Sequence, residues 1–151
     1  MTPSRLRLFL HTDVIIAGSA SPDGASHALF QVAELRLLEA WTSPLVLTEV
    51  RRNLLQKLPR GLPIFEVLWP KSLQIGPDPS EQGMVRYADY AHAKDAHVVA
   101  AAIQAQADWL VTFNVRHFYS PPGLIVLRPG DAVQRIRGSI GRLAADSWES
   151  T

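Results

Sequence analysis

The segment Asp95–Phe118, with the sequence DAHVVAAAIQAQADWLVTFNVRHF, decides the fold. An acidic residue opens an alanine-rich stretch that is typical of a helix, and a short turn leads into the apolar run Trp109–Val111, which is typical of a buried strand. The strand ends in Thr112-Phe113-Asn114. Helix N-termini and the carboxyl ends of strands face one crevice in an α/β fold, so we expect the polar groups at these two places to lie close together.

Apolar runs and helix-like stretches alternate along the rest of the chain, separated by the breaker-rich loops Ala17–Gly24 and Gly76–Gln82. The expected strands are Leu6–Leu10, Leu35–Trp41, Ser72–Ile75, Trp109–Thr112 and Leu124–Leu127. The expected helices are Ala25–Ala33, Pro44–Lys57 with Ser43 as its cap, Leu62–Trp69, Met84–His92, one that begins at Asp95, and Pro129–Arg137. The alternation predicts a three-layer α/β/α sandwich with a central parallel sheet. We expect one domain over residues 1–138 and a C-terminal tail over 139–151.

The composition fits one globular domain, with 151 residues, 47% apolar and 19% charged. The absence of cysteine excludes a disulfide scaffold and a thiolate metal site. The formal net charge is only +1, so bulk charge does not indicate a nucleic-acid partner, although basic residues gather in two stretches. These are Arg51, Arg52, Lys57 and Arg60, and Arg128, Arg135, Arg137 and Arg142; solvated helix faces would also explain them. The sequence has neither a membrane-length apolar run nor a signal-peptide cleavage site, so we expect a cytoplasmic protein with no membrane partner.

Four stations along the chain, between about Leu6 and Ile136, resemble the PIN-domain family of metal-dependent nucleases. They are His11-Thr12-Asp13-Val14, Ser43–Val50, Lys94–Val98, and Thr112-Phe113-Asn114 followed by Arg116-His117-Phe118. The resemblance implies that the four acidic positions of the family fall on His11, Glu49, Asp95 and Asn114. The family has an acid at the first position, and that acid usually binds the metal directly. His11 departs from this pattern.

Asp13 offers a replacement for the missing acid. If the first strand extends to residue 13, side chains 11 and 13 point to the same side, and Asp13 supplies the carboxylate. The expected catalytic residues are then Asp13, Glu49, Asp95 and Asn114. The expected metal ligands are Asp13, Glu49, Asp95 and His11, holding Mg²⁺ or Mn²⁺, with the imidazole shifting preference towards Mn²⁺. Such a metal would activate water for phosphodiester hydrolysis.

The resemblance implies a divalent-metal-dependent endoribonuclease, similar to the toxins of toxin–antitoxin pairs, with RNA, an antitoxin protein and a second copy of the chain as partners. The expected substrate-binding residues are Thr112, Arg51, Arg52, Lys94 and Arg116. One alternative is a degenerate PIN domain that has lost catalysis and is retained for protein or RNA binding. Another is an unrelated doubly wound domain, such as a small phosphotransfer module.

Each candidate residue also has a purely structural explanation. Asp95 would cap its helix, and Glu49 would pair with Arg52. Asp13 and Asn114 are common turn residues after strands, and Thr112 would serve as a capping hydroxyl. His11 would be a neutral core histidine, and His97 a packed or surface side chain.

Overall fold

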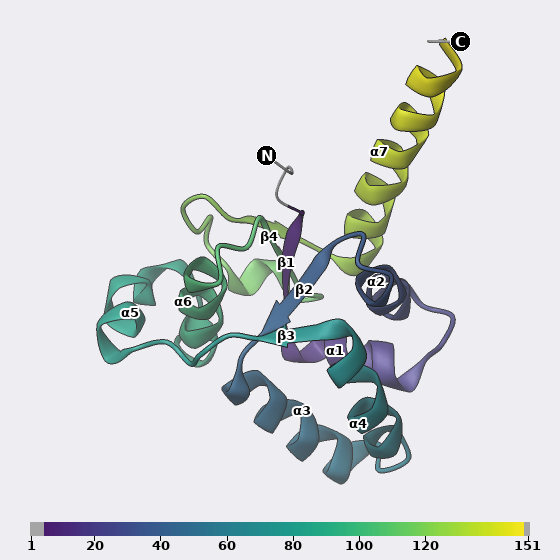
Figure 1. The fold of residues 1–151 in the computed structure, drawn as a ribbon. Coiled ribbons are helices and arrows are strands. Elements are labelled where there is room, and N and C mark those ends of the chain that lie inside the picture. The colour runs from purple at the N-terminus through teal and green to yellow at the C-terminus, as the bar shows by residue number, and fades with distance from the viewer. Residues whose placement is uncertain (1–4, 150–151) are drawn as a thin grey trace.

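A computed structural model describes residues 5–149 of the chain, with side chains as far as Arg142. At its centre lies a sheet of five strands, all parallel, in the order β3-β2-β1-β4-β5 (Figure 1). The strands are β1 (Arg7–Leu10), β2 (Glu39–Thr42), β3 (Leu73–Ile75), β4 (Trp109–Val111) and β5 (Ile125–Leu127). The predicted α/β sandwich around a parallel sheet is confirmed.

Helices cover both faces of this sheet. They are α1 (Thr12–Ala20), α2 (Ala25–Glu34), α3 (Pro44–Lys57), α4 (Gly61–Ser72), α5 (Glu81–Arg86), α6 (Ala96–Gln104) and α7 (Pro129–Glu149), with the 3₁₀ turns η1 (Ala88–Tyr90), η2 (Ala93–Asp95) and η3 (Val115–His117). Figure 1 shows α5 and α6 on one side of the sheet, α2 on the other, and α7 projecting from the body. Within the described residues, no helix is long and apolar enough to cross a membrane.

The core lies on both faces of the central strand. Leu8, Phe9 and Leu10 of β1 are at most 1% exposed, as expected for a strand with neighbours on both edges and helices on both faces. The predicted start of α3 is confirmed, because the Ser43 hydroxyl accepts a hydrogen bond from the Val46 amide at 3.3 Å and Pro44 occupies the first helical position.

Several expected boundaries are wrong. The second strand was expected to begin at Leu35, but β2 begins at Glu39, and the helix expected over Met84–His92 begins at Glu81 and ends at Arg86. Ala17–Ala20 was expected to be part of a loop, but α1 runs through it. Gly18 does not break the helix. Its missing side chain leaves room for the ring of Phe30 on α2, because a Cβ at this position would overlap a ring atom of Phe30. At the other end of the chain, the helix expected to stop at Arg137 continues to Glu149, so the backbone shows no break at residue 138. The division into a domain and a tail remains a prediction, and residues 150–151 lie outside the described part.

An ion pair between the two strands at the sheet centre gives a testable pH dependence. Arg7 Nε lies 2.7 Å from Glu39 Oε2. Burial alone would raise the pKa of Glu39, but hydrogen bonds from Trp41 and Gln74 and the charge of Arg7 lower it. A lowered folded-state pKa means that the stabilisation is complete above the unfolded-state pKa of about 4.3 and is lost as the pH falls through the folded-state value.

Glu39→Gln is therefore expected to lower the free energy of unfolding at pH 7 by at most about 1 kcal/mol and to have little effect near pH 3. Urea unfolding of both proteins at the two pH values measures this difference. An equal loss at both pH values would show that the charge of Glu39 contributes nothing.

Candidate functional site

The site lies at the carboxyl ends of the central strand β1 and its neighbour β4. Leu10 pairs with Val111, so His11 and Thr112, which follow directly, lie side by side. The His11 amide donates a hydrogen bond to the Val111 carbonyl at 3.1 Å, and both polar side chains are buried. The sequence correctly predicted that these stations meet at one edge of the sheet.

Asp13 reaches this edge by a route other than the predicted one. β1 ends at Leu10 and α1 begins at Thr12, so the alternation of a strand does not apply, and the premise that placed residues 11 and 13 on one strand face is wrong. Asp13 instead projects from the first turn of α1 towards the loop after β4. Its Oδ2 accepts three hydrogen bonds, from the Phe113 amide at 3.0 Å, Thr112 Oγ1 at 3.2 Å and Asn114 Nδ2 at 3.3 Å.

His11 lies between this group and Asp95. Its Nδ1 is 3.0 Å from Thr112 Oγ1 and its Nε2 is 3.3 Å from Asp95 Oδ1. Its Nδ1 also lies 3.6 Å from Asp13 Oδ1. The imidazole of His11 therefore links Asp95 on one side with Thr112 and Asp13 on the other.

Asp95 is held by two imidazoles. It is 5% exposed, ends η2, and makes no capping hydrogen bond with its side chain, so the capping explanation is wrong. Its second oxygen, Oδ2, lies 3.3 Å from His117 Nδ1, and the ring of His117 stacks on His92 at 4.1 Å. Burial raises the pKa of Asp95, but the hydrogen bond and charge of His11, with smaller effects of His117 and Lys94, bring it below its ordinary value.

Glu49 enters the site from α3 and is bound at both oxygens. Its Oε2 accepts a 2.7 Å hydrogen bond from Thr12 Oγ1, and its Oε1 lies 3.1 Å from His97 Nε2. The hydrogen bond from His97 outweighs burial and lowers the pKa of Glu49. Its ion-pair partner is therefore His97 of α6, in place of the expected Arg52.

The expected substrate-binding residues divide into two groups. Arg51 is turned onto α4, where its Nε lies 2.6 Å from Glu66 Oε1 and its guanidinium covers the Phe65 ring, so the structure does not bring it into the site. Arg52, Lys94 and Arg116 are exposed. Lys94 directly precedes Asp95, and Arg116 lies in η3, two residues after Asn114.

Sequence reasoning did not include His97 and His117 among the site residues. His97 is 8% exposed and bonded to Glu49, and His117 is bonded to Asp95. The signal that was available is position: each histidine follows a candidate residue within three positions, His97 after Asp95 and His117 after Asn114. The exposed aromatic residues Phe113 (46%) and Tyr119 (48%) were likewise not singled out.

The donor set does not fit the divalent cation that the resemblance implies. Across residues 5–142, no three His, Asp or Glu side chains are arranged to hold one metal ion. Both carboxylates that would be the main ligands, Glu49 and Asp95, are already bonded to histidines. His11, whose two ring nitrogens face Thr112 and Asp95, stands where a further carboxylate would be needed. One carboxylate oxygen of the site is not bonded in this way: Asp13 Oδ1 is buried without a hydrogen-bond partner in the described structure.

Comparisons with known proteins agree with this architecture. The model of the PIN domain matches residues 7–116. Similar solved structures include VapBC2 from Rickettsia felis bound to a DNA fragment from their promoter, with 17% identity, a TM-score of 0.63, and coverage of 80% of this chain and 97% of that one. FitAcB from Neisseria gonorrhoeae is 15% identical with a TM-score of 0.58, covering 81% and 97% of the two chains.

The sarcin–ricin loop cleaving toxin VapC20 from Mycobacterium tuberculosis is 13% identical with a TM-score of 0.51, covering 72% of this chain and 90% of that one. Among curated proteins, none matches this sequence. The likeness to the solved structures shows the fold, and the family model covers well over half of the chain. The chain therefore belongs to the PIN-domain family.

Proposed function

We propose that this protein is a PIN domain that binds single-stranded RNA at the carboxyl edge of its sheet, with a catalytic centre closed by His11. The observation that carries this proposal is the imidazole of His11, which lies within hydrogen-bonding distance of both Asp95 and Thr112. By the resemblance in sequence, His11 stands at the first acidic position of the family. Its Nε2 contacts the Asp95 oxygen that would otherwise be available to a divalent cation.

The surface around the closed centre supports RNA as the ligand. Lys94 and Arg116 are exposed at this edge and suit phosphate oxygens. Phe113, directly after Thr112, and Tyr119, beside His92, present aromatic side chains that are close to half exposed. Cations next to exposed aromatic rings are the combination that binds single strands, through backbone contacts and base stacking.

A partner of the antitoxin kind is part of the proposal, as is a cytoplasmic location. The likeness in fold to VapBC2 and FitAcB supports the antitoxin partner. We also propose a second copy of this chain as a partner, in a homodimer.

A second candidate is the active toxin, an endoribonuclease that uses Mg²⁺ or Mn²⁺. Two observations favour it: Asp13, Glu49 and Asp95 all reach the same edge of the sheet, and Asp13 Oδ1 is buried without a partner. In this candidate His11 would have to leave Asp95 before a cation could bind. The sarcin–ricin loop cleaving toxin VapC20 has the same fold and supports RNA as the substrate of this candidate.

One experiment separates the two candidates. Wild type and Asp95→Asn are incubated with a panel of labelled structured and single-stranded RNAs in Mg²⁺, Mn²⁺ or EDTA, and both binding and cleavage are recorded. We expect wild type to bind single-stranded RNA and to leave it intact under all three conditions. Metal-dependent cleavage by wild type that is lost in Asp95→Asn would establish the nuclease, and an absence of RNA binding would contradict both candidates.

A further inference from the structure

Three arginines form a row along α7. Arg128, Arg135 and Arg142 recur every seven residues, which places them on one side of a helix at steps of about 10 Å. The Ala132 amide donates a hydrogen bond to the Arg128 carbonyl at 3.0 Å, so the helical repeat includes Arg128 although α7 begins at Pro129. All three are exposed.

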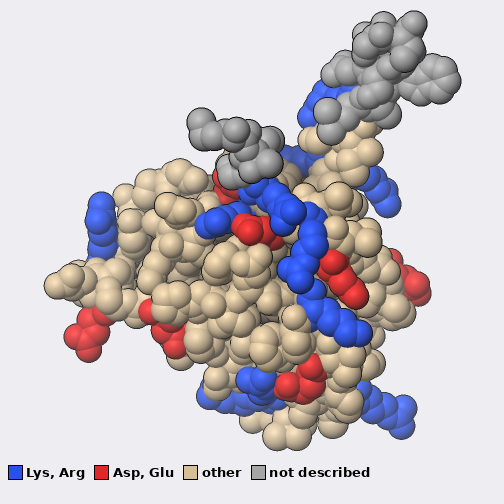
Figure 2. Space-filling view, viewed as in Figure 1, with Lys and Arg blue, Asp and Glu red and all other residues tan. Residues whose placement is uncertain are grey.

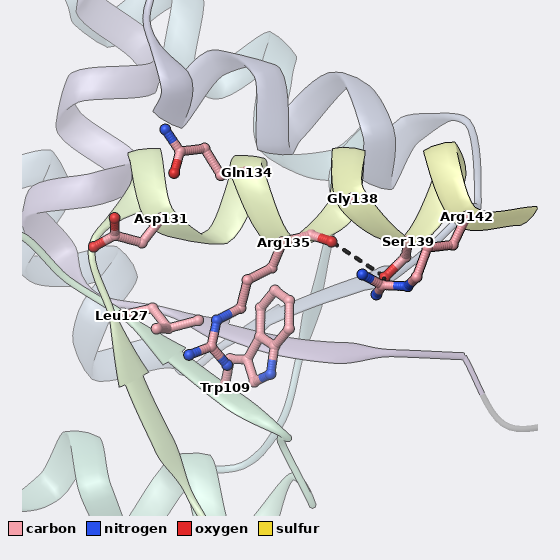
Figure 3. Close-up of a pocket in the computed structure, with 8 residues that line it drawn as sticks. All are labelled: Trp109, Leu127, Asp131, Gln134, Arg135, Gly138, Ser139 and Arg142. Atoms are coloured by element: carbon pink, nitrogen blue, oxygen red, sulfur yellow. Dashed lines mark hydrogen bonds between the residues drawn. The ribbon is translucent and has the colours of Figure 1, made fainter. Parts of the chain in front are cut away.

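A groove of about 550 Å³ lies beside two of these arginines, Arg135 and Arg142 (Figure 3). Its lining residues are Trp109, Leu127, Asp131, Gln134, Arg135, Gly138, Ser139 and Arg142. The Arg135 guanidinium lies 5.9 Å from the Trp109 ring, and Arg142 donates a hydrogen bond to Ser139 Oγ at 3.3 Å. Asp131 lies at the helix N-terminus, where the helix dipole favours a carboxylate. The charge of the lining is nevertheless net positive.

One end of the groove lies one strand away from the candidate site. Leu127, at one end of it, closes β5, and its carbonyl accepts a hydrogen bond from the Thr112 amide at 2.9 Å. Thr112 is the residue whose hydroxyl contacts His11. A chain that crosses the carboxyl edge beside Thr112 would pass Arg128 and Asp131 and then follow α7 along Arg135 to Arg142.

We infer that this arginine row is a track for the backbone of single-stranded RNA leaving the candidate site. The inference rests on RNA as the ligand of the proposed function and adds the path that the strand takes. The guanidinium groups of Arg135 and Arg142 can each bind a backbone phosphate through paired N–H donors. The Trp109 ring and the guanidinium plane above it provide a surface on which a base can stack. An acidic protein segment would meet the same charges, but continuity with the strand-end edge favours the nucleic acid.

Arg142 and Arg137 provide a matched pair of variants. Both are exposed arginines of α7, yet Arg142 lines the groove while Arg137 does not, and Arg137 lies about 200° around the helix from Arg135. Arg142→Ala and Arg137→Ala thus remove the same charge from different sides of one helix. Because Arg135 also packs on Trp109, Arg135→Ala is made only together with Arg142→Ala, and circular dichroism and thermal melts check that both variants fold.

The measurement is fluorescence anisotropy of a labelled, mixed-sequence single-stranded RNA with the full chain, over a salt series in EDTA. Arg142→Ala is expected to weaken binding about fivefold and to make the slope of log K against log salt shallower by about 0.7; the double variant should change the slope by about 1.4. Arg137→Ala should bind like wild type. Polyglutamate peptide is added as a competitor.

Each other outcome overturns the inference. Equal losses in Arg142→Ala and Arg137→Ala would show a general charge effect without a track. An unchanged double variant would place the RNA elsewhere, and displacement of RNA by polyglutamate at lower concentrations than by unlabelled RNA would identify the row as a protein-docking face. A wild type that does not bind RNA at low salt would instead contradict the proposed function itself.

Discussion

His11→Asp is expected to give this PIN domain saturable Mn²⁺ binding and metal-dependent RNA cleavage, neither of which the proposed function assigns to the wild type. The substitution removes the ring that faces Asp95 and adds a carboxylate at the end of β1. Released from His11, Asp95 can turn an oxygen towards a cation shared with Glu49 and the new acid. A bound metal ion contributes several kcal/mol of transition-state stabilisation, so cleavage should rise about 100-fold or more.

Two control variants test whether the gain comes from the added carboxylate and from Asp95. His11→Asn removes the imidazole without adding a charge and should gain neither metal binding nor cleavage. His11→Asp combined with Asp95→Asn should lose what His11→Asp gained. Calorimetric titration with Mn²⁺ measures binding independently of cleavage. A folded His11→Asp variant that binds no metal would show that His11 is not what closes the centre.

Phe30→Ala is expected to lower the free energy of unfolding by about 3–5 kcal/mol, the range for deleting a large buried aromatic side chain. Phe30 is 1% exposed, and its ring lies against Gly18 of α1 so closely that a Cβ there would meet Cε2 at 2.4 Å and Cδ2 at 2.6 Å. For a domain of this size the loss corresponds to a decrease in melting temperature of about 10 °C or more. Urea unfolding and calorimetry measure both quantities.

Gly18→Ala tests whether this contact is the cause. In the wild type the added methyl group clashes with the Phe30 ring and should destabilise by about 1–3 kcal/mol. In the Phe30→Ala background the ring is absent, and alanine should be neutral or stabilising because it favours the helix. Additive effects of the two substitutions would contradict a direct contact.

The succession of the five strands along the chain and the edge where the site lies could be predicted from the sequence, because both depend on local patterns; the helix α1 was missed. Alternating apolar runs and caps such as Ser43-Pro44 indicate a parallel α/β sheet, and in such a sheet the strand-end residues meet. The prediction of a loop over Ala17–Gly24 was wrong at Gly18, because the role of this glycine is determined by Phe30 on another helix. Local composition cannot distinguish a glycine that breaks a helix from one that makes room for a ring.

The partners of the acids could not be predicted for a similar reason. Glu49 pairs with His97, 48 positions away, and Asp95 is shared by His11 and His117 from two other segments. The sequence placed each residue at the correct edge, but the choice among several donors there depends on side-chain directions that only the packed structure fixes. The pleat argument for Asp13 failed because His11 stands at the junction between β1 and α1, one residue beyond the strand.

The pairing of β1 with β4 has a consequence for how this protein is made. Leu10 and Val111 are register partners although about a hundred residues separate them, and β4 in turn needs β5 at its other edge. During synthesis the first strand must wait for the last third of the polypeptide before the sheet can close. The strand-end surface is therefore incomplete on a growing chain, and a ribosome that stalls before β5 would release a product that lacks it.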